Sequence, residues 1–337
     1  MERKADSLFA GRYLLIKELG VGGFSEVWLA QDTATQLQVA LKIYAPGAGM
    51  DNECLDLFTQ EFALVFNLNH SNLLRPTYYD TYERMPYLVM PFCEKGAASR
   101  LIGKATEEQL WQFIHDVAAA LAYLHTQDPP VIHQDIKPAN ILIDNADRFL
   151  LTDFGISTKI RTTLRKSLPR SADYSSAGTP QYMAPERFSK DPSPIMANDI
   201  WSLGATLFEL ITGETPFKEM GGLAQKNGAD IPHFPKNTPY SKELQHLITK
   251  CLDSKPWQRP TAADLKKGRG KWLEKKGKKG IIWIILVAIV LGIAGVGVLW
   301  HRQRTPQPQN STLLLPNNDA DTLLEVIPDT LFTLPPE

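Results

Sequence analysis

The sequence has few cysteines, almost no net charge and no apolar stretch at its N-terminus. Its three cysteines, Cys54, Cys93 and Cys251, show no CxxC spacing, which fits buried thiols in a reduced compartment better than a disulfide framework or a zinc site. The formal net charge of −1 gives no general attraction to nucleic acid, so nucleic acid is not an expected partner. Because the N-terminus, MERKADSLFAGR, contains no apolar stretch of signal-peptide length, the first domain is expected to stay on the side where it is synthesised.

A long uncharged run stands near the other end of the chain. Residues 281–300, IIWIILVAIVLGIAGVGVLW, contain no charged side chain. As a helix rising about 1.5 Å per residue, this run would be ~30 Å long, which is the thickness of the hydrocarbon core of a bilayer. A buried helix of a soluble domain is the alternative, but such a helix is rarely apolar all round for this length. We therefore predict one transmembrane helix over residues 281–300.

The charges on the two sides of this run predict its orientation. Residues 267–280 are interpreted as a basic juxtamembrane linker, and residues 301–337 as a short extracytoplasmic tail that is expected to be disordered. Lys and Arg near a span gather on its cytoplasmic side, so the preceding domain is expected to be cytoplasmic, at the cell (inner) membrane. Ala288 and Gly292 form a small-xxx-small pair, which predicts a homodimer through the span, although glycine is frequent in membrane helices anyway. The basic residues between 266 and 279, against the single acid Glu274, are Lys266, Lys267, Arg269, Lys271, Lys275, Lys276, Lys278 and Lys279.

Residues 11–266 are predicted to form one mixed domain with two halves. The first half is strand-rich, with strands expected over residues 13–19, 26–31, 38–44 and 87–92 and one helix over residues 55–68. The second half is mostly helical. Thr106 and Gln109 have the spacing of a capping box and precede apolar residues at helical intervals, which predicts a helix start there.

Two features of the first half point to phosphate chemistry. Gly20, Gly22 and Gly23 lie between two expected strands, where a glycine-rich hairpin can close over a phosphate chain; an ordinary turn is the alternative. Lys42 lies inside the apolar strand 38–44, where an unpaired ammonium would be unfavourable and therefore needs anionic partners. Triphosphate oxygens and the carboxylate of Glu61, on the following helix, would serve.

The segment His133-Gln-Asp135-Ile-Lys137-Pro-Ala-Asn140 is followed by Asp153-Phe-Gly155 and then by Ala184-Pro-Glu186. Asn140 and Asp153 supply the oxygen ligands that Mg²⁺ prefers, with Mn²⁺ as an alternative. Asp135 is then left for a substrate hydroxyl.

This ordered set resembles the eukaryotic-type serine/threonine protein kinases, and in particular the bacterial kinases with a single membrane span. The resemblance implies a bilobal α+β fold, with a β-rich N-lobe and a helical C-lobe, and ATP with Mg²⁺ as cofactors. It implies that Lys42 contacts the phosphates and pairs with Glu61, that Asp135 accepts or orients the hydroxyl proton, and that Lys137 steadies the γ-phosphate. It also matches Asp199 to a buried residue that holds the catalytic loop, and Arg259 to a partner of Glu186. The residues expected around the nucleotide are Leu19, Gly20, Gly22, Gly23, Val27, Ala40, Lys42, Met90, Pro91, Cys93 and Leu142.

Gln134 departs from the family pattern, which has an arginine before the catalytic aspartate. Because an amide cannot make the charge-assisted contact that orders a phosphorylated activation loop, activity is expected to depend only weakly on loop phosphorylation. The function expected is phosphorylation of serine or threonine on proteins, in membrane-linked signalling with autophosphorylation. A pseudokinase scaffold and a kinase for small molecules are the alternatives.

Overall fold

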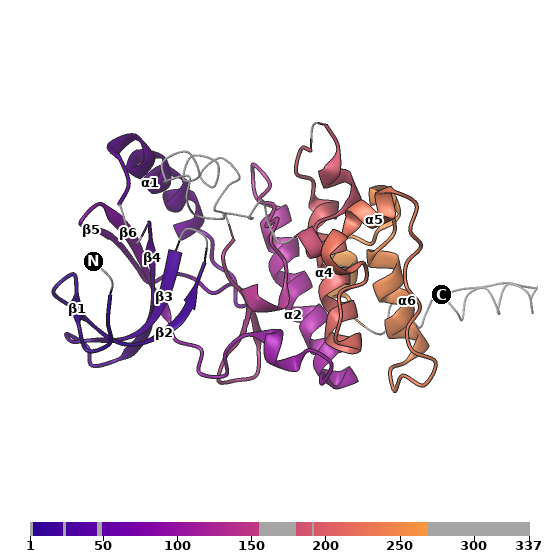
Figure 1. Cartoon of the computed structure of the whole chain (residues 1–337), viewed down its shortest axis with the longest axis horizontal. Coiled ribbons are helices and arrows are strands. Elements are labelled where there is room, and N and C mark those ends of the chain that lie inside the picture. Colours follow the sequence, from indigo (N-terminus) through magenta and orange to yellow (C-terminus); the bar gives the residue numbers. More distant parts are fainter. Residues whose placement is uncertain (1–2, 23–24, 46–48, 155–179, 191, 269–337) are drawn as a thin grey trace, which may run out of the picture. The chain divides into compact units, whose positions relative to one another are not determined.

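The computed structural model describes residues 3–22, 25–45, 49–154, 180–190 and 192–268, without the side chains of Glu61, Leu64 and Val65. These residues fall within one compact unit, Met1–Lys278. Figure 1 shows a strand-rich part and a helical part in this unit, which are the two lobes that the resemblance predicts. The bilobal α+β fold is therefore confirmed.

The N-lobe is an antiparallel sheet in the order β1-β2-β3-β4-β6-β5. Its strands are β1 (Leu8–Phe9), β2 (Tyr13–Val21), β3 (Ser25–Asp32), β4 (Gln38–Tyr44), β5 (Tyr78–Tyr82) and β6 (Met85–Pro91). The four predicted strands correspond to β2, β3, β4 and β6. The sequence interpretation missed β1, which has two residues, and β5, whose side chains are mostly exposed.

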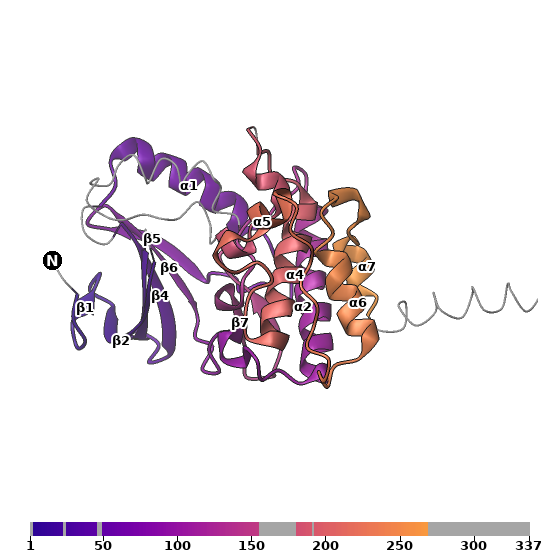
Figure 2. The same cartoon turned by 45° about the vertical axis from the view of Figure 1, so that its right-hand side comes forward.

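Helix α1 (Asn52–Phe66) packs on one side of this sheet, as Figure 2 shows. It begins earlier than predicted because Asp51 accepts a hydrogen bond from the Cys54 backbone N–H, 2.8 Å away. Cys54, Phe58 and Phe62 are buried against Tyr44 and Leu88 of the sheet. This packing sets the position of Glu61, which lies on the same helix.

The C-lobe is built around two long helices, α2 (Glu107–His125) and α4 (Met196–Thr212). The predicted capping box at Thr106 is confirmed, since Thr106 and Gln109 bond each other's backbone N–H groups. Most side chains of α4 are buried, so this helix is surrounded by protein and needs no polar face. Further helices are α5 (Gly222–Lys226), α6 (Lys242–Cys251) and α7 (Ala262–Lys266).

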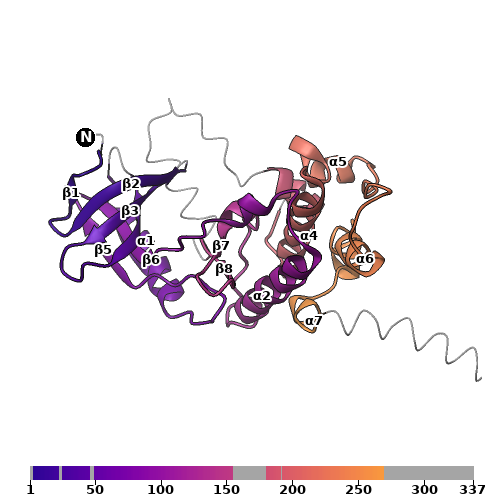
Figure 3. The same cartoon turned by 90° about the horizontal axis from the view of Figure 1, so that it is seen from below.

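A short hairpin of β7 (Ile141–Ile143) and β8 (Phe149–Leu151) lies beside these helices (Figure 3). The Leu74 backbone N–H donates to the Leu151 carbonyl at 2.9 Å, which joins the segment before β5 to this hairpin. Single 3₁₀ turns complete the lobe: Ala98–Leu101, Pro138–Asn140, Pro180–Tyr182, Pro185–Phe188, Lys218–Met220 and Pro256–Gln258.

The three cysteines are buried and form no disulfide, as predicted. Across the described ranges, no helix has both the length and the apolarity needed to cross a bilayer. The predicted span, residues 281–300, lies outside those ranges, as do the linker beyond Gly268 and the tail.

Candidate active site

Asp135 is held by two side chains of its own loop. The Asn140 Nδ2 donates to the Asp135 carbonyl at 2.8 Å and to its Oδ2 at 2.9 Å, and Lys137 Nζ lies 3.2 Å from the same carboxylate oxygen. Oδ1 makes no hydrogen bond to any described residue. This leaves one carboxylate oxygen of Asp135 for an incoming hydroxyl, with the ammonium of Lys137 beside it.

The backbone of this loop is anchored by Asp199, which is fully buried on α4. Its two carboxylate oxygens accept from the backbone N–H of His133 at 2.9 Å and of Gln134 at 2.8 Å, and His125 Nε2 lies 2.9 Å away. Gln134 has a φ of 66°, which is uncommon for a residue with a side chain and needs such support. The predicted role of Asp199 as the anchor of the catalytic loop is confirmed.

Lys42 is paired with Asp153. The Lys42 Nζ lies 2.5 Å from Asp153 Oδ1, and 9% of the lysine side chain is exposed. Burial is the largest single influence and would lower the pKa of Lys42. The charge of Asp153 and its hydrogen bond, together with Tyr44, outweigh burial, so the pKa lies above its ordinary value and the group stays charged. The other predicted partner, Glu61, lies on α1, and its side chain is outside the described part of the structure.

Asn140 and Asp153 are brought together by Thr152, the residue between β8 and Asp153. The Thr152 backbone N–H donates to the Asn140 carbonyl at 3.0 Å, and His133 Nε2 lies 2.8 Å from the Thr152 carbonyl. Because the amide nitrogen of Asn140 points to Asp135, its amide oxygen is left for another partner. An amide oxygen and a carboxylate are suitable ligands for a divalent metal that bridges phosphate oxygens. The donor set therefore fits the predicted metal.

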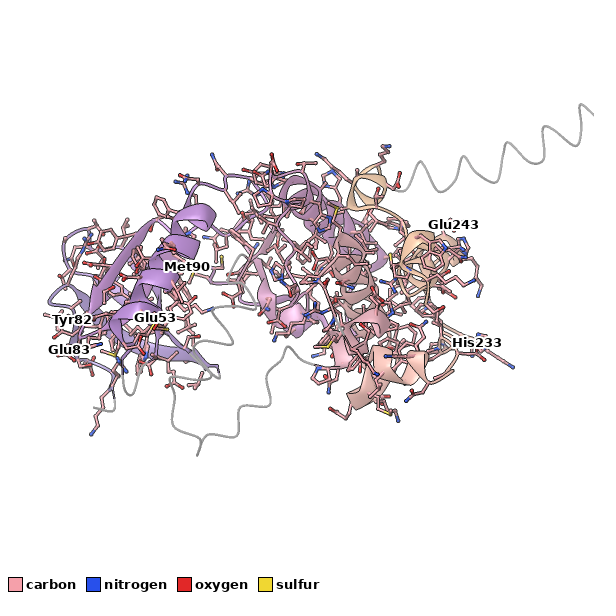
Figure 4. All side chains as sticks on the ribbon, turned by 90° about the horizontal axis from the view of Figure 1, so that it is seen from above. Glu53, Tyr82, Glu83, Met90, His233 and Glu243 are labelled. Atoms are coloured by element: carbon pink, nitrogen blue, oxygen red, sulfur yellow. The ribbon has the colours of Figure 1, made fainter. Side chains whose placement is uncertain are left out.

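The residues predicted to contact adenine form a small apolar cluster. Ala40, Met90 and Cys93 are buried in it, and Val27 and Leu142 pack against it. Met90, labelled in Figure 4, comes from β6 and pairs with Ala40 of β4. Leu74 and Leu150 also belong to this cluster and were not predicted, because nothing in their local sequence distinguishes them from other core leucines.

The remaining predicted contacts of the nucleotide lie around this cluster. Leu19 is 43% exposed, and Gly20 lies near the end of β2, where it pairs with Val27 of β3. Gly22 donates its backbone N–H to the Ser25 carbonyl at 2.7 Å, while Gly23 is outside the described residues. Pro91 ends β6 at the surface, in register with Val39 of β4.

Gln134 has a neighbour that the sequence interpretation missed. The Arg187 Nη2 donates to the Gln134 Oε1 at 3.3 Å, and its Nη1 donates to the Pro192 carbonyl at 2.6 Å. A cation thus lies next to the position where the family has its arginine, although it comes from the segment after Glu186. The one sequence signal for this contact is that Arg187 directly follows Ala184-Pro-Glu186.

The segment from residue 180 to residue 188 is held in place by an ion pair and by close packing. Arg259 donates to both carboxylate oxygens of Glu186 at 2.6 and 2.9 Å, which confirms the predicted pair. On its other side, the Gly222 N–H donates to the Met183 carbonyl at 2.9 Å. A Cβ on Gly222 would lie 2.3 Å from the Pro185 nitrogen, so only glycine fits this approach.

Comparisons with known proteins agree with this geometry. The profile described as "Protein kinase domain" matches residues 13–269. The chain is 32% identical over 264 residues to mitogen-activated protein kinase kinase kinase 5 of Arabidopsis thaliana, covering 74% of this chain and 35% of that protein. It is 29% identical over 272 residues to CBL-interacting protein kinase 11 of Oryza sativa subsp. japonica, covering 80% and 53%. It is also 29% identical over 270 residues to the serine/threonine-protein kinase PrkC of Bacillus subtilis, covering 76% and 40%.

A site of this kind on a bilobal fold defines a protein kinase domain, and its use of ATP and a divalent metal follows from that class. The chain belongs to the eukaryotic-type serine/threonine protein kinase family. The matched segments span from about a third to about half of the length of these relatives.

Proposed function

We propose that this protein transfers the γ-phosphoryl group of ATP to serine or threonine side chains of proteins, with Mg²⁺ as the metal. The observation that carries the proposal is a network of contacts. Asn140 donates to Asp135 and accepts from the Thr152 backbone N–H. Asp153, the next residue after Thr152, pairs with Lys42. These are the residues that phosphoryl transfer needs for the hydroxyl, the metal and the phosphates.

The chain's own residues would do three things in the reaction. Asp135 would orient the hydroxyl through its free Oδ1 and accept its proton, and Lys137, next to it, would stabilise negative charge on the moving phosphoryl group. Lys42 would hold the phosphates with a charge that its buried site maintains. When bound, the metal neutralises phosphate charge and orients the γ-phosphoryl group.

The two alternatives have less support. A pseudokinase scaffold would not need Asp135, Asn140, Asp153 and Lys42 together in one network. A kinase for small molecules would not need the segment 180–188 that the Glu186 ion pair and Gly222 hold beside the catalytic loop. A held segment of this kind suits an extended polypeptide substrate.

The full chain in detergent micelles, given labelled ATP, Mg²⁺ and a generic protein substrate, is expected to incorporate label as phosphoserine and phosphothreonine, and to label itself. Chelation of the metal should stop the reaction. Phosphoamino-acid analysis after acid hydrolysis measures the outcome. Label found only on tyrosine, or no transfer to protein at all, would contradict the proposal.

We also propose that the kinase domain is cytoplasmic and anchored by a helix over residues 281–300. The support is the uncharged run and the basic residues 266–279 before it, each of which would contribute about 1 kcal/mol of attraction to anionic headgroups near the surface. Ala288 and Gly292 support a homodimer through the span. Replacement of both residues by isoleucine should weaken the homodimer in a membrane dimerisation assay.

Protease added outside spheroplasts is expected to remove an epitope placed after Glu337 and to spare one placed before Met1. The reason is the asymmetry of basic residues around the span, eight before it against Arg302 and Arg304 after it. Immunoblotting with and without detergent permeabilisation measures both tags. Removal of the N-terminal tag with protection of the C-terminal one would reverse the proposed topology.

A further inference from the structure

A cavity of about 740 Å³ is lined by residues of both lobes. Its lining comes from Phe66 at the end of α1, from Ser71 and residues 73–77 before β5, from residues 91–93 at the end of β6, and from the β7–β8 hairpin, including Leu150. Lys42, Asp135, Asn140 and Asp153 do not line it. Its volume is within the range of about 300–1,000 Å³ that is usual for binding sites. We call it the rear cavity.

The walls of the rear cavity are fixed by backbone hydrogen bonds. Leu74 is bonded to Leu151, and the Thr77 N–H donates to the Val89 carbonyl at 2.7 Å. Pro76 and Pro91 are also lining residues, and their rings restrict the backbone on two sides. The rear cavity is therefore preformed, and little conformational entropy of the protein would be lost when a ligand binds there.

One layer of side chains separates the rear cavity from the nucleotide pocket. Leu74, Cys93 and Leu150 line the rear cavity and also belong to the cluster that contains Ala40 and Met90. A ligand on the rear side would rest on an apolar floor without occupying the place of adenine. A nucleotide and a rear ligand are thus able to bind together.

The rim of the rear cavity carries positive charge. Asp144 is its single acidic lining residue, and that carboxylate is already used, since Arg148 lies 2.7 Å from it and the Ala146 and Arg148 backbone N–H groups donate to it at 2.9 Å. Arg75 is exposed, and its guanidinium lies 5.1 Å from the centroid of the Phe66 ring. Within the described part of the chain, Arg75 makes no ion pair. Because Phe66 is itself a lining residue, this contact places the guanidinium, with its five N–H donors, at the rim of the rear cavity.

We propose that the rear cavity is a docking site for a segment of the protein substrate in which an acidic side chain adjoins apolar ones. The carboxylate binds Arg75 and the apolar side chains rest on Leu74, Leu150 and Phe92. The proposal depends on the proposed function, because it assigns this site to the same substrates. A docking segment would raise the local concentration of the acceptor residue without touching the catalytic loop.

The binding test uses the full chain in detergent micelles and two pools of fluorescein-labelled octapeptides. One pool has Glu at the fourth position among Leu, Val, Phe and Pro, and the other has Lys there. The Glu pool is expected to bind at least tenfold more tightly than the Lys pool by fluorescence anisotropy, and a saturating non-hydrolysable ATP analogue should not displace it. Arg75→Glu should weaken binding of the Glu pool at least tenfold, since a charge-assisted contact becomes a repulsion.

Lys236→Glu is the matched control, because Lys236 is exposed, makes no ion pair within the described residues and changes the net charge equally. It should leave binding unchanged, and both variants should keep the melting temperature of the unmodified chain. Equal binding of the two pools, equal effects of the two variants, or full displacement of the Glu pool by free succinate would overturn the proposal.

A kinetic test separates this inference from the proposed function. Joining the best Glu peptide to a serine acceptor peptide should lower its KM at least fivefold at unchanged kcat, and Arg75→Glu should remove that gain. The same variant should phosphorylate the acceptor peptide alone at the normal rate. Normal phosphorylation with no Arg75-dependent gain would refute the docking site only, whereas Arg75-dependent binding without phosphorylation of any peptide would refute the proposed function and with it the assignment to substrates.

Discussion

Asp153→Ala is expected to lower phosphoryl transfer by about a thousandfold or more, because it removes both a metal ligand and the partner of Lys42. The variant also leaves the ammonium of Lys42 buried without that partner, so some loss of stability is expected with it. Asp153→Asn keeps the shape of the side chain and reduces that difficulty. Both variants should be compared with the unmodified chain by initial rates at saturating ATP and Mg²⁺.

Asp135→Asn tests the other end of the same network. It is expected to reduce kcat by about 10²–10⁴-fold, the usual contribution of a general base, while the affinity for ATP changes little. The reason is that Asp135 lies at the hydroxyl side, where Asn140 and Lys137 hold it, and not among the residues that surround adenine.

The control for these variants is Asp230→Asn, an exposed aspartate with no ion pair in the described structure. It should keep full activity and the same melting temperature. Retention of normal phosphoryl transfer by Asp153→Asn and Asp135→Asn together would show that the assigned roles are wrong.

Arg259→Ala is expected to lower the free energy of unfolding by about 3–5 kcal/mol, which is the usual effect of removing one partner from a buried ion pair. The Arg259 side chain is fully buried, and besides Glu186 it bonds the carbonyls of Asp253 and Ala197, each at 2.8 Å. Its loss would leave two carbonyls without this donor and would leave Glu186 with the Asn198 amide but no cation. Chemical denaturation followed by tryptophan fluorescence measures the change.

Lys95→Ala provides the comparison for Arg259→Ala. Lys95 forms an ion pair with Asp147 at 2.7 Å, but 80% of the Asp147 side chain is exposed. Its removal should change the free energy of unfolding by about 1 kcal/mol or less, because water screens exposed pairs. Similar losses in the two variants would contradict the structural role given to the Arg259–Glu186 pair.

Neighbouring residues in the sequence were sufficient to predict some of the secondary-structure elements. Strand β4 was predicted with its observed bounds because its residues are apolar and β-branched between turn signals. The start of α2 followed from the Thr106 capping box, which needs only four neighbouring residues. The hairpin of β7 and β8 was not predicted, since runs of three apolar residues fit a strand and a buried helix equally well.

In the active site, too, some contacts between residues close in sequence were predicted and some contacts between distant segments were not. Asp135, Asn140 and Lys137 are close in sequence, so their chemistry could be inferred from their spacing. The pairing of Lys42 with Asp153 was not inferred, because the two residues are far apart in the chain. The sequence interpretation had assigned Glu61 to Lys42 and Asp153 to the metal. Arg187 was missed for a similar reason: its contact with Gln134 joins two segments whose approach depends on how α4 and Arg259 hold them.

The sequence by itself determined the family, the residue types of the catalytic site and the uncharged run at residues 281–300, since each of these is a pattern along the chain. The tertiary structure alone showed where Arg187 lies, that Lys42 meets Asp153, and that Leu74, Cys93 and Leu150 lie between the rear cavity and the cluster of Ala40 and Met90. Contacts and cavities of this kind arise where distant segments pack together, and packing depends on the volumes and positions of all the side chains around them.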